Sequence, residues 1–217
     1  MAVMDKKKTE TELTRETATI PPPAFTQTIF PIRFTAPYVS NPMTDEAKNQ
    51  MRNTQLAGQT AKKGKKREAK NFDSLYQQSR HLSEDGWDGI PAEAFRSAMV
   101  SACSIVGFKM THAKQAIQVL GDGRDSEGSG LIKILKSKPQ KLESYIPNSN
   151  GSMDIRVRAK YIDVEAGLKV RWDSDMFTTS DIANLIERAG LQVGVGAGRP
   201  LSKKSGGCGW GTFELVK

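Results

Sequence analysis

The lysine and arginine side chains of this sequence are grouped in ways that could bind phosphate. Ammonium and guanidinium groups donate charge-assisted hydrogen bonds to phosphate oxygens. One group of cations is a short basic run, which consists of Lys62, Lys63, Lys65, Lys66 and Arg67. The sequence predicts that this run grips a phosphate backbone, and a solvated surface loop is the alternative interpretation.

A second group of cations alternates with apolar residues. The cations are Arg156, Arg158 and Lys160, and the apolar residues between them are Ile155, Val157 and Ala159. Successive side chains of a β-strand point to opposite faces, so the alternation predicts one cationic face and one apolar face. We expect the cationic face to extend the path of a phosphate backbone over a sheet.

Glycine is dense near the C-terminus, and the residues concerned are Gly194, Gly196, Gly198, Gly207, Gly209 and Gly211. Glycine permits positive φ and close approach of the backbone to another backbone or to phosphate. Arg199, Lys203 and Lys204 add positive charge to this segment. A dinucleotide-binding loop requires a preceding strand and a following helix, whereas here a helix precedes and a strand follows. A polyanion cradle, a subunit contact and a flexible loop therefore stay open, and we expect no nucleotide cofactor.

Residues suited to catalysis or metal binding are sparse. The two histidines, His81 and His112, have no spacing typical of a metal site or a catalytic triad. The two cysteines, Cys103 and Cys208, lie far apart and form no CxxC pair. Asp122, Asp125 and Glu127 lack the residue order of a calcium loop, so a polar hairpin loop is the better interpretation. The sequence predicts no cofactor, no metal and no catalytic residue.

Composition favours a polyanionic partner. The chain has 217 residues and a formal net charge of +8, and neutralised phosphates release condensed counterions. The N-terminal residues are charged and lack the apolar segment of a signal peptide. No apolar run approaches the roughly 20 residues of a membrane span. We expect a cytoplasmic protein, in the host cytoplasm if the chain is viral, with no membrane partner.

The elements that must position these residues form an α+β pattern. Residues 1–24 read as a flexible tail, residues 25–34 as a strand in which Pro31 favours an edge position or a bulge, and residues 41–89 as a polar insertion. Phe72, Tyr76 and Trp87 in the insertion could stack bases, or belong to the local core.

The rest of the pattern supplies helices and paired strands. A helix opens at Ile90-Pro91, with Pro91 at its first position, and ends at Gly107. Residues 116–120 and 131–135 read as two strands joined by a loop, and residues 155–162 and 168–172 as another pair. A helix over residues 180–189 with Gly190 as its stop, and a strand over residues 212–216, complete the chain. This order predicts a single ferredoxin-like domain over residues 25–217, β-α-β-β-α-β with an antiparallel sheet and an extra hairpin.

Three segments together resemble the RAMP superfamily, the repeat-associated RNA-binding proteins of CRISPR effector complexes. The helix start Ile90-Pro91-Ala92-Glu93-Ala94-Phe95-Arg96-Ser97-Ala98 is similar to that superfamily's IPxxxxRxA helix. The segment from Gly194 to Phe213 resembles its glycine-rich loop and last strand. Arg33-Phe34-Thr35-Ala36-Pro37 with the insertion resembles its first strand and thumb. The chain is also similar to phage-encoded proteins of about this size.

The resemblance implies a subunit that stacks head to tail along single-stranded RNA, and it adds Arg33 and Arg96 to the cations expected to meet phosphates. The chain is short for a CRISPR backbone subunit and has no recognisable cleavage motif, which favours a standalone binder. We expect a non-catalytic protein that reads the phosphate backbone of single-stranded RNA or DNA and forms homo-oligomers. The alternatives are a viral or cellular assembly protein with acidic partners, and a metal-independent RAMP-type endoribonuclease.

Overall fold

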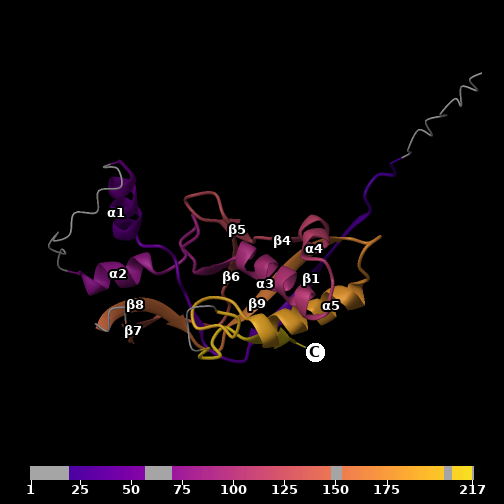
Figure 1. The fold of residues 1–217 in the computed structure, drawn as a ribbon. Helices are drawn as coiled ribbons and strands as arrows, with labels where there is room; N and C mark the ends of the chain where they lie inside the picture. The colour runs from indigo at the N-terminus through magenta and orange to yellow at the C-terminus, as the bar shows by residue number, and fades with distance from the viewer. Residues whose placement is uncertain (1–19, 57–69, 148–152, 203–206, 217) are drawn as a thin grey trace, which may run out of the picture.

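A computed structural model describes residues 20–56, 70–147, 153–202 and 207–216. These residues form five α-helices and three antiparallel sheets, a mixed α+β architecture (Figure 1). None of the described helices is long and apolar enough to cross a membrane.

The largest sheet has four antiparallel strands. They are β1 (Phe25–Phe34), β4 (Ile117–Leu120), β9 (Glu165–Asp173) and β10 (Phe213–Leu215). Their order across the sheet is β10-β1-β9-β4. The strand predicted over residues 25–34 is confirmed. Pro31 lies at the point where the neighbouring strand β10 ends, and its carbonyl accepts a hydrogen bond from the amide of Val216 at 2.9 Å. Its missing N–H therefore costs the sheet little.

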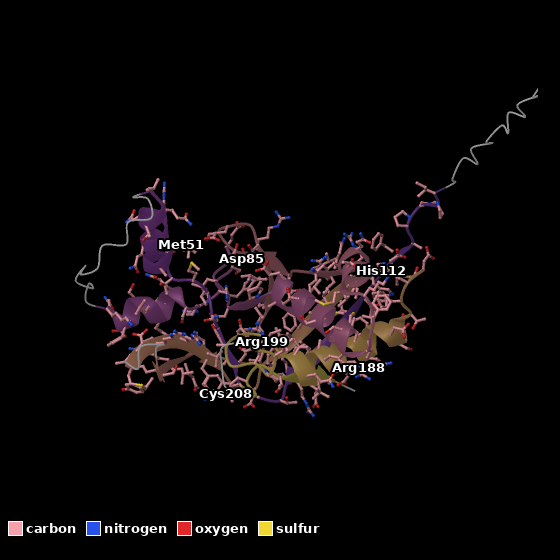
Figure 2. The ribbon with its side chains drawn as sticks, in the orientation of Figure 1. Met51, Asp85, His112, Arg188, Arg199 and Cys208 are labelled. Atoms are coloured by element: carbon pink, nitrogen blue, oxygen red, sulfur yellow. The ribbon has the colours of Figure 1, made fainter. Side chains whose placement is uncertain are left out.

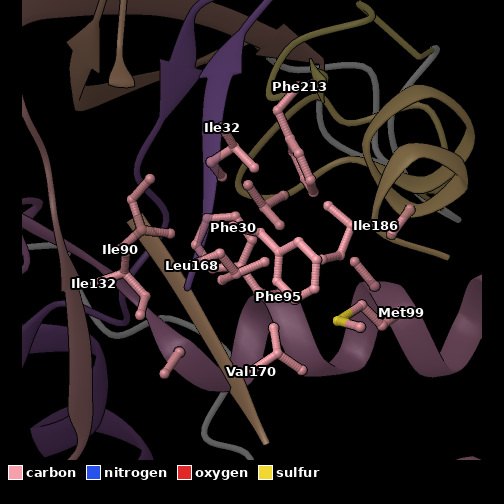
Figure 3. Packing of buried hydrophobic residues seen from close by; sticks show 14 of the residues in the cluster. Phe30, Ile32, Ile90, Phe95, Met99, Ile132, Leu168, Val170, Ile186 and Phe213 are labelled. Atoms are coloured by element: carbon pink, nitrogen blue, oxygen red, sulfur yellow. The ribbon is translucent and has the colours of Figure 1, made fainter. Parts of the chain in front are cut away.

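Two helices, α3 (Ala92–Ile105) and α5 (Thr179–Arg188), cover one face of this sheet and enclose the core (Figure 1). Phe95 of α3 is fully buried among strand and helix side chains (Figure 3). Its ring centroid lies 5.4 Å from that of Phe213. Phe95, Ala98, Met99 and Ala102 form a buried apolar stripe along α3, and Gly107, with φ of 74°, follows its end, as predicted. Pro91 caps the helix instead of starting it, because the short strand β3 (Gly89–Pro91) holds it extended.

The N-terminus of α5 is closed by a capping box. The amide of Asp181 donates to Thr178 Oγ1 at 3.2 Å, and the amide of Thr178 donates to Asp181 Oδ2 at 2.9 Å. The prediction that Gly190 stops this helix is wrong, because the chain continues as a π-helical turn, η1 (Ala189–Val193). A Cβ atom on Gly190 would lie 1.9 Å from the carbonyl oxygen of Phe213. Gly190 therefore serves the close approach of η1 to β10.

The second sheet has the order β2-β8-β7, and its strands are β2 (Tyr38–Val39), β7 (Gln140–Pro147) and β8 (Met153–Tyr161). The predicted pairing of residues 155–162 with 168–172 is wrong, because β8 pairs with β7 and β2 while β9 belongs to the largest sheet. The chain turns at Asp163, whose φ is 55°, and Glu165 already starts β9.

The third sheet is small and has the order β3-β6-β5, with β5 (Gly123–Arg124) and β6 (Gly130–Lys133) forming a hairpin. The two strands predicted at 116–120 and 131–135 exist in shortened form. They lie in different sheets, because β4 pairs with β9 and β6 pairs with β3 and β5. Helix α4 (Met110–Ala116) leads directly into β4.

Part of the predicted insertion folds against the second sheet. Its helix α2 (Phe72–Gln78) packs against β8, and α1 (Asp45–Leu56) lies at the same end of the molecule (Figure 1). The side chain of Asn71 caps α2. Lys48 of α1 forms an ion pair with Glu127 at 2.5 Å, which ties this end to the β5–β6 hairpin.

Candidate nucleic-acid interface

Strand β8 carries the cationic residues on one face, as the alternation predicts. Helix α2 packs on the opposite face, where Val157 and Ala159 are buried. The register places Lys141 of β7 beside Ala159, and Lys141 forms an ion pair with Asp73 of α2 at 2.8 Å. The side chains of Arg156, Arg158 and Lys160 therefore lie on the face turned away from α2. We call these three residues the cationic strip.

Among the described residues, the cationic strip forms no ion pair with an acid. Arg156 is exposed, while Arg158 and Lys160 are half-buried. Burial, and then the neighbouring charge of Arg156, lowers the pKa of the Arg158 guanidinium. Both effects disfavour the charged form of Arg158, and a bound anion would offset them.

The glycine-rich segment continues the plane of the second sheet beyond β2. The amide of Ser40 donates to the carbonyl of Ala159 in β8, whereas the carbonyl of Val39 faces the other way and accepts from the amide of Ala197 at 2.8 Å. Val39 is also the register partner of Lys160. With neighbouring strands about 4.8 Å apart, the glycine-rich segment lies about 10 Å from β8. Lys160 is therefore the member of the cationic strip that lies nearest to the glycine-rich segment.

The described parts of the glycine-rich segment are packed rather than open. Its two arms pair through the amide of Val195 and the carbonyl of Gly211 at 2.9 Å. Gly196 and Gly211 both have positive φ, and a Cβ atom on Gly196 would lie 2.5 Å from the carbonyl oxygen of Val39. At these positions glycine permits contact between backbones. Of the three interpretations of this segment, the flexible loop is therefore wrong for the described arms.

A groove runs between this segment and α3. Its volume is about 390 Å³, and it is lined by Glu93, Ser97 and Ser101 of α3 and by Arg199 and Leu201 of the glycine-rich segment, among others. Arg199 Nη1 donates to the carbonyl of Gly196 at 3.0 Å, which fixes this guanidinium against its own loop. Figure 2 shows Arg199 and Cys208 close together on this part of the molecule. Among the described residues that line the groove, Arg199 is the one cation and Glu93 the one anion.

Two of the cations predicted to meet phosphates have internal partners instead. Arg96 Nε donates to the carbonyl of Ile117 at 2.8 Å, and its Nη2 donates to the carbonyl of Lys114. Arg96 thus holds the α4–β4 junction against α3. Arg33 forms an ion pair with Glu214 across β1 and β10 at 2.7 Å. Neither residue lies on the cationic strip.

Most of the remaining predicted cations lie outside the described residues. These are Lys62, Lys63, Lys65, Lys66, Arg67, Lys203 and Lys204. Among the described candidates, the fold therefore brings Arg156 and Arg158 together with Lys160, and places Arg199 in the segment beyond β2. Gly194, Gly198, Gly207 and Gly209 also have positive φ.

The aromatic residues of the insertion are half-buried. Tyr76 packs against the core, and the ring of Trp87 fills the space beside Gly123, where a Cβ atom would lie 2.6 Å from it. These two rings take part in local packing, the second of the two interpretations. The face of the largest sheet that no described helix covers carries Phe25, Lys169 and Arg171, which the sequence analysis did not single out. The period-two alternation of β1 and β9 is the signal that could have identified them.

The described residues show no catalytic arrangement. No three His, Cys, Asp or Glu side chains among them gather to hold a metal ion. His112 is exposed on α4, and Figure 2 shows it well separated from Arg199. Asp125 Oδ1 accepts from the amides of Glu127 and Ser129, and Asp122 Oδ2 accepts from the amide of Lys133. Asp125 thus orders the turn of the β5–β6 hairpin, and Asp122, just before β5, is joined to the end of β6. Both contacts agree with the predicted polar hairpin loop.

No family model matches the chain, and a search of curated proteins finds no significant match.

Proposed function

We propose that this protein binds single-stranded nucleic acid through its phosphates, with the cationic strip on β8 as the principal contact. The observation that carries the proposal is the cluster of Arg156, Arg158 and Lys160 on one face, without an acidic partner in the described structure. Alternate residues of a strand lie about 6.6 Å apart, a spacing that an extended phosphate backbone can follow. Contacts to phosphate carry no sequence information, so binding is expected to be weakly sequence-dependent.

We also propose a ferredoxin-like arrangement for residues 25–217. The four strands of the largest sheet are β1, β4, β9 and β10 in chain order, and α3 and α5 are the helices that follow β1 and β9. The sheet order β10-β1-β9-β4 supports this arrangement. Relationship to the RAMP superfamily is part of the same proposal. It is supported by the position of the Ile90–Ala98 helix start beside the glycine-rich segment, across the groove described above.

The test is fluorescence anisotropy of the full chain with labelled single-stranded RNA, single-stranded DNA and duplex over a range of salt concentrations. The decisive variant combines Arg156→Gln, Arg158→Gln and Lys160→Gln. We expect it to weaken single-strand binding at least about tenfold at low salt. We also expect the slope of log K against log salt to fall by about 0.7 for each phosphate that the variant no longer neutralises, or about 2 for all three cations.

A variant of equal charge change controls for net charge. It combines Lys48→Gln, Lys136→Gln and Arg188→Gln, which lie on α1, after β6 and on α5. Lys48 and Lys136 are paired with carboxylates, and Arg188 is exposed. If both triple variants weaken binding equally, only net charge matters and the cationic strip is not the site. Absence of binding by the wild-type protein at low salt would reject nucleic acid and leave acidic proteins as the partners of the strip.

A further inference from the structure

The largest sheet has a second face that no described helix covers. Along β1 the inward side chains Phe30, Ile32 and Phe34 are buried, whereas the alternate side chains are exposed. Phe25 is 45% exposed and Ile29 is 58% exposed. On β9 the residues of this outer face, which include Lys169 and Arg171, are half-buried beside their strand neighbours. This open face therefore presents an aromatic ring, an aliphatic side chain and two cations that form no ion pair within the described residues. It also carries carboxylates: Asp173 is the register partner of Phe25, while Glu165 and Glu214 are paired with Lys136 and Arg33.

The open face holds its aromatic ring and a guanidinium as one platform. The guanidinium carbon of Arg171 lies 5.7 Å from the centroid of the Phe25 ring. Gln118 of β4 fixes the guanidinium, because its Oε1 accepts from both Nε and Nη2 of Arg171. The register puts Gln27 of β1 directly beside Arg171 on the other side. Aromatic rings and arginine planes are the surfaces on which unstacked bases lie, and amide side chains hydrogen-bond base edges.

We propose that the open face is a base-stacking subsite for single-stranded nucleic acid, with Phe25 and Arg171 as its platform. The proposal rests on the proposed function, because it concerns the bases of the strand whose phosphates meet the cationic strip. Lys169 lies two residues from Arg171 and forms no ion pair within the described residues, so it can meet a phosphate next to the stacked base. Stacking of this kind tolerates all four bases.

Unpaired cations favour nucleic acid over a protein as the occupant, because Lys169 and Arg171 form no ion pair within the described residues, whereas Glu165 and Glu214 of this face are paired with Lys136 and Arg33. The centre of a protein–protein interface is depleted of charged residues and built from contiguous apolar groups. Here Lys169 and Arg171 lie between Ile29 and Phe25 on one side and β4 on the other. The apolar side chains are thus interrupted by cations at the middle of the sheet, an arrangement that suits a polyanion with aromatic bases.

The test compares two labelled strands of about 12 nucleotides, a length within the usual site sizes of single-strand binders. One is an oligothymidylate or oligouridylate, and the other has the same phosphates but base-free spacers. Phe25→Ala is expected to weaken binding of the base-containing strand by at least about fivefold. It should leave binding of the base-free strand and the salt slope unchanged. Phe25→Tyr should restore binding, and Tyr145→Ala, which truncates an exposed aromatic residue on β7, is the matched control.

A fluorescence measurement keeps the test informative if Phe25→Ala folds poorly. In Phe25→Trp, stacking of a base should quench the fluorescence of the added tryptophan with the base-containing strand and not with the base-free strand. The wild type, with its three tryptophans, provides the background signal. If Phe25→Ala binds each of the two strands as tightly as the wild type does, with the same salt dependence, the stacking subsite is overturned. The proposed function would then still stand. Failure of the wild type to bind either strand would overturn both. A changed sedimentation coefficient of Phe25→Ala without nucleic acid would assign the open face to self-association and overturn the subsite.

Discussion

The carboxylate of Asp88 joins its own segment to Arg80, which follows α2, and to Tyr161 of β8. Its carboxylate accepts from Arg80 Nε and Nη2, each at 2.8 Å, and from the hydroxyl of Tyr161 at 2.7 Å. The side chains of Arg80 and Asp88 are 21% and 14% exposed. The hydrogen bonds to this carboxylate raise the pKa of Arg80, so its guanidinium stays charged. This network connects the end of α2 to β8, directly beneath the face that carries the cationic strip.

Asp88→Ala should therefore be strongly destabilising. The substitution leaves the Arg80 guanidinium and the Tyr161 hydroxyl without their partner in a partly buried site, and we expect a loss of about 3–5 kcal/mol in the free energy of unfolding. Urea denaturation followed by circular dichroism measures it. Lys136→Ala is the matched control, because it breaks an ion pair whose lysine is 70% exposed, and it should cost less than about 1 kcal/mol. Equal losses in the two variants would contradict this account.

His81 makes stability depend on pH. Burial lowers the pKa of its imidazole, and the negative charges of Asp125 and Glu93 only partly offset this effect. The unfolded chain, with a histidine pKa of about 6.5, takes up its proton at a higher pH than the folded protein does. Stability from this residue is therefore present above the unfolded pKa and is lost as the pH falls below it.

We expect His81→Gln to reduce the decrease in unfolding free energy between about pH 7 and pH 5. Denaturation at a series of pH values measures the slope. His112→Gln, at an exposed position on α4, serves as the control. A pH slope that is identical in wild type and His81→Gln would show that this histidine is not the source.

Among the single elements, the glycine-rich segment requires glycine for two different reasons, backbone conformation and close packing. Gly209 and Gly211 have φ of 71° and 69°, so both favour glycine. A Cβ atom on Gly209 would meet nothing within 4 Å, whereas one on Gly211 would lie 1.8 Å from the carbonyl oxygen of Val195. The amide of Gly211 also donates to the carbonyl of Pro37 at 2.9 Å, next to β2.

Gly209→Ala should cost only the left-handed backbone strain, about 1–2 kcal/mol. Gly211→Ala should cost more than about 3 kcal/mol, because the two arms of the segment must separate. Thermal unfolding monitored by circular dichroism distinguishes the two variants. If their losses are the same, positive φ alone explains these glycines, and close packing of the arms against β2 is not needed for stability.

For the molecule as a whole, the head-to-tail stacking that the RAMP resemblance implies predicts complexes that grow with the length of the strand. A heterologous contact that does not close on itself generates open arrays, and a strand long enough for several copies aligns them. Sedimentation velocity of nuclease-treated protein with single-stranded RNA of increasing length should show mass rising in steps. A defined oligomer without nucleic acid, unchanged when RNA is added, would instead favour the assembly-protein alternative.

Features that depend on local periodicity could be predicted from the sequence alone. The alternation around Arg156 and Arg158 placed the cations opposite the apolar residues of β8, since side chains of a strand alternate whatever the strand pairs with. The stripe of α3, the strand of residues 25–34 and the turn at Gly107 follow from the same kind of local rule. These features are confirmed because neighbouring residues suffice to specify them.

Which elements pack together could be seen only in the tertiary structure. The pairing of β8 with β7 escaped the sequence pattern, because alternation states which residues share a face and not which strand lies alongside. The same is true of individual cations. Arg96 is as basic as Arg156 in sequence, but the fold gives Arg96 two backbone carbonyls and gives Arg156 no described acid. Whether a charge is satisfied within the protein or is open to a ligand depends on contacts between residues far apart in the chain.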